Sequence, residues 1–86
     1  MVEPDTASTL GEIRRALQQP GKVAATYRFT QAEKRALREL VYTYGGAGVH
    51  TSENEITRIA LNWLLENHRQ QGQDSVLAQV LGKPQE

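Results

Sequence analysis

Residues 22–30 read Lys-Val-Ala-Ala-Thr-Tyr-Arg-Phe-Thr, and this stretch decides the fold that the sequence predicts. It is the one part of the chain in which side chains alternate with a period of two. One face is apolar and aromatic, with Val23, Ala25, Tyr27 and Phe29, whereas the other is mostly polar, with Lys22, Ala24, Thr26, Arg28 and Thr30. This alternation is typical of a β-strand.

No second segment of the chain can pair with this predicted strand. The other extended candidate, residues 49–51, is too short and follows a glycine-rich stretch. An isolated strand leaves its backbone donors and acceptors unpaired, so the simplest partner is the same strand of a second chain. We therefore expect a homodimer with an intermolecular two-stranded antiparallel β-ribbon. Such a ribbon fits the DNA major groove.

Length and composition also favour self-association. A chain of 86 residues buries little surface as a monomer, and the absence of cysteine excludes disulfide bonds and thiolate chemistry. We find no basic-then-apolar leader and no run of 18 apolar residues. We therefore expect a cytoplasmic protein that does not enter a membrane and that, in a prokaryotic cell, is associated with the nucleoid.

The formal net charge is zero, yet the charges are unevenly distributed. Residues 1–13 hold three acids and no base (−3), residues 14–38 hold seven bases and one acid (+6), and residues 39–86 hold three bases and six acids (−3). The basic block coincides with the predicted strand, as a DNA-facing surface requires. The alternative that remains open is a solvated helix surface without a partner.

Two long helices are predicted after the strand. Thr30 and Glu33 have the spacing of a capping box, so the first helix begins there and runs to Gly45. The second begins after the N-cap residue Ser52 and runs to about His68. Their repeating apolar residues, with the inward face of the strand, form the predicted dimer core: Tyr27, Phe29, Leu37, Leu40, Val41, Ile56, Ile59, Ala60, Trp63 and Leu64.

Short helices are predicted at both ends. A disordered tail, residues 1–7, precedes a helix that starts with a capping box of Thr9 and Glu12, and the alternative for this region is a frayed segment. A last helix, capped by Asp74 or Ser75, carries an apolar stripe for a possible protein partner: Val76, Leu77, Val80 and Leu81. The predicted parts are a tail and short helix (1–21), a dimerisation and DNA-binding domain (22–69) and a C-terminal helix and tail (70–86).

The sequence offers no constellation of residues for catalysis or metal binding. His50 and His68 lie 18 residues apart, and no carboxylate pair has metal-ligand spacing. Glu53 and Glu55 straddle a helix start and point to different faces. We therefore expect no enzymatic activity, no metal and no cofactor.

The order strand, helix, helix over residues 22–69 resembles the ribbon-helix-helix DNA-binding family of the MetJ and Arc type. The similarity lies in Thr-Tyr-Arg-Phe-Thr at 26–30 and Ser-Glu-Asn-Glu-Ile-Thr-Arg-Ile-Ala at 52–60. The resemblance implies sequence-specific binding of double-stranded DNA by a homodimer, with the β-ribbon in the major groove. Ala24, Thr26 and Arg28 would then contact bases.

Phosphate contacts are expected from two regions. One is the basic block, with Lys22, Lys34 and Arg35, and the other is the start of the second long helix, with Thr51, Ser52 and Asn54, where the helix dipole favours an anion. Members of the family act as transcriptional repressors, antitoxins, or plasmid copy-control and partition proteins. We expect a repressor, with an antitoxin or other protein-interaction module and a plasmid-maintenance protein as alternatives. A monomeric helical adaptor, in which residues 22–29 are a loop, is a further alternative.

Overall fold

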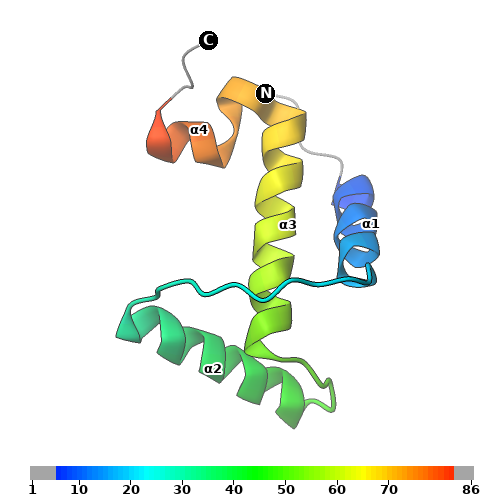
Figure 1. Ribbon diagram of the computed structural model, residues 1–86, viewed down its shortest axis with the longest axis vertical. Helices are drawn as coiled ribbons and strands as arrows, with labels where there is room; N and C mark the ends of the chain where they lie inside the picture. The colour runs from blue at the N-terminus through cyan, green and yellow to red at the C-terminus, as the bar shows by residue number, and fades with distance from the viewer. Residues whose placement is uncertain (1–5, 83–86) are drawn as a thin grey trace.

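The computed structural model describes residues 6–82, which form four α-helices arranged around the longest of them, α3 (Figure 1). The elements are α1 (Thr6–Leu17), α2 (Gln31–Gly46), α3 (Glu53–Gln71), the short 3-10 helix η1 (Gly72–Asp74) and α4 (Val76–Leu81). α1 packs alongside α3, α2 lies across the N-terminal end of α3, and α4 lies at its C-terminal end (Figure 1).

The predicted ribbon-helix-helix fold is wrong, because residues 6–82 contain helices and no β-strand. Residues 21–30, here called the extended segment, cross α3 without forming a sheet (Figure 1). None of the backbone N–H groups of residues 21–29 donates a hydrogen bond within the described part of the chain. The alternating pattern identified an extended backbone correctly, but a strand also needs a hydrogen-bonded neighbour, and residues 6–82 do not provide one.

The predicted starts of α2 and α3 are confirmed. The Thr30 hydroxyl accepts a hydrogen bond from the Glu33 N–H at 3.1 Å, and the Glu33 carboxylate accepts one from the Thr30 N–H at 2.8 Å. This is a complete capping box. The Ser52 hydroxyl accepts from the Glu55 N–H at 3.0 Å. α2 ends at Gly46, and Gly48 has a φ of +83°, which glycine adopts readily in the turn that follows.

The predicted start of α1 is wrong. The helix begins at Thr6, so two residues of the predicted tail are helical, and residues 1–5 of that tail lie outside the described residues. Thr9 lies inside the helix and is 6% exposed, and its hydroxyl accepts a hydrogen bond from the Gln70 side chain of α3 at 3.1 Å. A capping-box spacing reflects only local sequence. In the structure the Thr9 side chain bonds to Gln70 of α3 and does not cap α1.

α1 is also held at its C-terminal end. The Arg58 guanidinium on α3 donates to the Ala16 carbonyl oxygen at 2.8 Å and to the Leu17 carbonyl oxygen at 3.5 Å. These carbonyl groups belong to the last turn of α1, where a cation is favourable. The Ala16 carbonyl oxygen also accepts the Gln19 N–H at 3.2 Å. Arg58 thereby fixes the point from which the chain leaves α1 toward the extended segment.

The first turn of α4 is capped by its own N-cap residue and is joined to α3 by one hydrogen bond. The predicted cap Ser75 is fully buried, and its hydroxyl accepts from the Ala78 N–H at 3.2 Å. The side-chain oxygen of the buried Asn67 on α3 accepts from the Val76 N–H at 2.8 Å. Leu77 is half-buried, whereas Val80 and Leu81 are 76% and 75% exposed.

The predicted dimer core is not assembled within one chain. Among the described residues only Ile13 and Ala78 are buried apolar residues, and α2 has no buried residue. Tyr27 is 74% exposed and Trp63 is 42% exposed. The others of the predicted core are half-buried or exposed, namely Phe29, Leu37, Leu40, Val41, Ile56, Ile59, Ala60 and Leu64.

Candidate nucleic-acid interface

The extended segment presents the predicted base-contacting residues to solvent. Ala24, Thr26 and Arg28 are exposed, and so are all other residues of the segment. The Arg28 guanidinium makes no hydrogen bond or ion pair with any described residue. The segment is therefore an exposed, extended stretch of chain with a free cation near its end.

Five cations gather on the extended segment and the first turns of α2, and we call them the basic surface: Lys22, Arg28, Lys34, Arg35 and Arg38. Only Lys34 has a carboxylate partner among the residues that the structure describes. The single acid nearby in sequence, Glu33, already accepts the Thr30 N–H in the capping box. Arg38 belongs to the basic block that the sequence showed, but it was not among the predicted phosphate-contacting residues, although it lies four residues from Lys34 on the same helix.

A pocket opens in the basic surface where the extended segment joins α2. It has a volume of about 270 Å³, and we call it the α2 pocket; its lining residues are Phe29, Thr30, Gln31, Lys34, Arg35 and Arg38. Two further grooves follow the segment over α3, and one of them shares Phe29 and Lys34 with the α2 pocket. The α2 pocket thus holds three cations of the basic surface, whereas the groove that adjoins it also has Glu53 in its lining.

The start of α3 holds the protein's own acids where phosphate contacts were predicted. Glu53 and Glu55 occupy its first turn. The Ser52 hydroxyl caps the helix, and the Thr51 hydroxyl donates to the Glu55 carboxylate at 2.8 Å. Asn54 lines the grooves beneath the extended segment. Phosphate contacts by Thr51, Ser52 and Asn54 stay a prediction, and any phosphate there would meet two carboxylates.

An ion pair joins this helix start to the basic surface. The Lys34 ammonium lies 2.6 Å from the Glu53 carboxylate, and the two residues come from α2 and α3. The hydrogen bond from Lys34 lowers the pKa of Glu53 below its ordinary value of 4.5, with smaller contributions from the charges of Lys34 and Arg38. Glu53 is therefore ionised at neutral pH and competes with any external anion for Lys34.

We expect Glu53→Gln to tighten binding to every DNA sequence by a similar factor. Removal of the carboxylate frees Lys34 for a phosphate, and the salt dependence should steepen by about one unit of slope. Glu12→Gln is the matched control, since it breaks an exposed ion pair with Arg15 on α1, away from the basic surface. Fluorescence anisotropy at several salt concentrations measures both variants. Equal affinities of wild type and Glu53→Gln would place the phosphate elsewhere.

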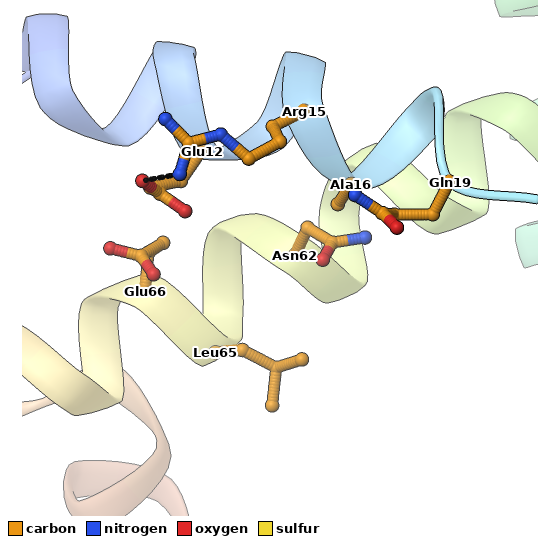
Figure 2. A pocket seen from close by; sticks show the side chains of 7 residues that line it. All are labelled: Glu12, Arg15, Ala16, Gln19, Asn62, Leu65 and Glu66. Atoms are coloured by element: carbon orange, nitrogen blue, oxygen red, sulfur yellow. Dashed lines mark ion pairs between the residues drawn. The ribbon is translucent and has the colours of Figure 1, made fainter.

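The groove between α1 and α3 has a different character (Figure 2). It has a volume of about 260 Å³, with Glu12 and Arg15 on α1 and Asn62 and Glu66 on α3 among its lining residues. Glu12 pairs with Arg15 at 3.2 Å, and Glu66 pairs with Arg69 at 2.5 Å. The latter contact lowers the pKa of Glu66. Because the charges of this groove are paired with each other or with Arg69, it is a less favourable site for an anion than the basic surface.

No described group of three or more histidine, aspartate or glutamate residues is placed to hold a metal ion. The helices of residues 6–82 are all too short or too polar to cross a membrane. Comparison with protein-family models, curated proteins and solved structures finds no match to this chain.

Proposed function

We propose that the protein binds double-stranded DNA sequence-specifically as a homodimer and acts as a transcriptional repressor. The basic surface carries this proposal. Four of its five cations are unpaired among the described residues, and all five lie beside an exposed, extended stretch of chain. Cations in such a surface neutralise phosphates and release counterions, which is the main source of affinity for DNA. Repression needs only occupancy of a DNA site, which binding alone provides.

The extended segment is the base-reading part of the proposed interface. Its backbone is narrow and unpaired within the described chain, so it can approach base edges closely. Arg28 can donate two hydrogen bonds to a guanine, and Thr26 can make a shorter contact. Ala24 offers only an apolar contact, which suits the methyl group of thymine. Lys22, Lys34 and Arg35 would hold phosphates and fix the position of the segment.

The exposed apolar surface supports the dimer. Large apolar side chains are strongly exposed among residues 6–82, including Val23 at 89%, Tyr27 at 74% and Tyr42 at 77%. Leu61 and Leu65 on α3 are half exposed, and α2 has no buried residue. A second copy would cover such apolar faces and also double the basic surface.

Selection of bound DNA from a random pool tests the proposed function. We expect enrichment of a two-fold symmetric site, because the two subunits of a homodimer read two half-sites. Sedimentation of the protein with the selected DNA should give two chains per site. Enrichment without a consensus, or no enrichment, would contradict sequence-specific binding. The position of the selected site relative to genes or a plasmid origin separates repression from plasmid maintenance.

A second candidate function, a protein-interaction module such as an antitoxin, is favoured by α4. Val80 and Leu81 are about three-quarters exposed on a helix that Ser75 and Asn67 hold in place. Rigid, exposed apolar side chains of this kind are suited to bind a partner protein. We expect Val80→Ser with Leu81→Ser to abolish co-purification of such a partner and to leave DNA binding unchanged. A partner retained by the double variant would exclude α4 as its binding site.

A further inference from the structure

We propose that the α2 pocket is a phosphate-binding site, which takes a single phosphodiester group of the DNA backbone. This inference deepens the proposed DNA binding and rests on it for the identity of the ligand. It adds Arg38 to the residues expected to contact phosphate, and it assigns Lys34, Arg35 and Arg38 to one phosphate.

The pocket is built by the spacing of residues on one helix. Gln31, Lys34, Arg35 and Arg38 stand at positions i, i+3, i+4 and i+7, so their side chains share one face of α2. Phe29 and Thr30, at the end of the extended segment, complete the wall. The aromatic wall and the polar helix face leave a hollow of about 270 Å³. This is slightly smaller than the pockets of about 300 Å³ or more that enclose small molecules.

The charges that line the pocket favour the binding of an anion. Three cations line it and no acid does. Lys34 and Arg38 are four residues apart on the helix, a same-sign arrangement that destabilises a helix unless an anion lies between the charges. The Glu53 carboxylate on α3 pairs with the Lys34 ammonium, and the charge of Arg38 makes a smaller contribution to the lowered pKa of Glu53. Arg35 and Arg38 nevertheless have no ion-pair partner among residues 6–82.

The donor types match a phosphate. An arginine guanidinium is planar and can donate two parallel hydrogen bonds to phosphate oxygens, whereas a lysine acts as a point charge. The first N–H groups of α2 add a positive potential at the same end of the helix. The Lys34 side chain is 49% exposed, so the pocket is open enough for a phosphate that is part of a long polymer.

A titration with inorganic phosphate at constant ionic strength tests the site without DNA. We expect saturable changes in the backbone amide NMR signals of residues 31–38, which sodium chloride does not reproduce. Arg38→Gln should abolish the saturation. Arg14→Gln should leave it intact, because Arg14 is an exposed cation without a described partner on α1. A wild type without localised changes, or an Arg38→Gln variant that still saturates, would overturn the site.

DNA titrations of the same variants identify the ligand. Arg38→Gln should lower the affinity for all DNA sequences by a similar factor and reduce the slope of the salt dependence by about one unit. Arg14→Gln should change neither quantity. Phosphate binding with an unchanged DNA slope in Arg38→Gln would overturn the assignment to a backbone phosphodiester. If wild type binds phosphate in the pocket but binds no DNA, the phosphate site stands and the proposed function fails.

Discussion

Arg28→Ala is expected to weaken binding to the selected DNA site by about 1–3 kcal/mol in each half-site and to remove discrimination at one base pair per half. Arg28 is exposed on the extended segment and has no described partner, so the substitution removes a contact to DNA without unbalancing a charge in the protein. Binding to selected and scrambled duplexes, measured in parallel, gives the affinity and the discrimination together.

Lys22→Ala is the matched control for this experiment. Lys22 is a second exposed cation at the other end of the extended segment. If it contacts only phosphate, its removal should weaken all sequences about equally and lower the salt dependence by roughly one unit of slope. Thr26→Ala should resemble Arg28→Ala with a smaller loss. An unchanged ratio of selected to scrambled affinity in Arg28→Ala would show that this segment does not read bases.

The urea midpoint of unfolding is expected to rise with protein concentration. If two chains fold and associate together, each tenfold increase in concentration adds about 1.4 kcal/mol to the free energy of unfolding of the dimer. With a slope of roughly 1–3 kcal/mol per molar urea, the midpoint should rise by about 0.5–1.4 M for each tenfold step. Trp63 on α3 is the probe, because it is 42% exposed in one chain and its surroundings change when a second chain covers it.

A concentration-independent midpoint would instead favour the monomeric helical adaptor.

The Val80→Ser and Leu81→Ser double variant separates two ways of forming a dimer. Both residues are strongly exposed on α4, so a dimer that uses α2 and α3 should keep its concentration dependence in this variant. A loss of the dependence would place the contact on α4.

The features that the sequence predicted correctly depend on residues a few positions apart. Thr30 and Ser52 were identified as helix caps, and Ser75 was one of two candidates for the last helix. Each of the three accepts the N–H of the residue three positions later. The basic block was visible for the same reason, since its charges follow one another in the sequence. Such local signals are set by short-range geometry, which a sequence displays directly.

The features that were missed depend on distant residues. Whether residues 22–30 form a strand is decided by a partner, and no local pattern supplies one. Thr9 looked like a cap, yet it is used by Gln70, which lies 61 residues away. Lys34 and Glu53 are 19 residues apart in the sequence, so no local pattern indicated that the Glu53 carboxylate would contact the Lys34 ammonium. The candidate site stays a prediction, and the ion pair between Lys34 and Glu53 within it was not predicted.

Both ends of the extended segment are anchored to the N-terminal half of the same helix. Arg58 of α3 holds the carbonyl groups of Ala16 and Leu17 before the segment, and Glu53 of α3 holds Lys34 after it. A free chain loses about 1–2 kcal/mol of conformational entropy for each residue whose backbone becomes ordered. A segment pinned at both ends has lost part of that freedom before it meets any ligand, so binding costs it less. α3 thus preorganises a stretch of chain that has no secondary structure of its own.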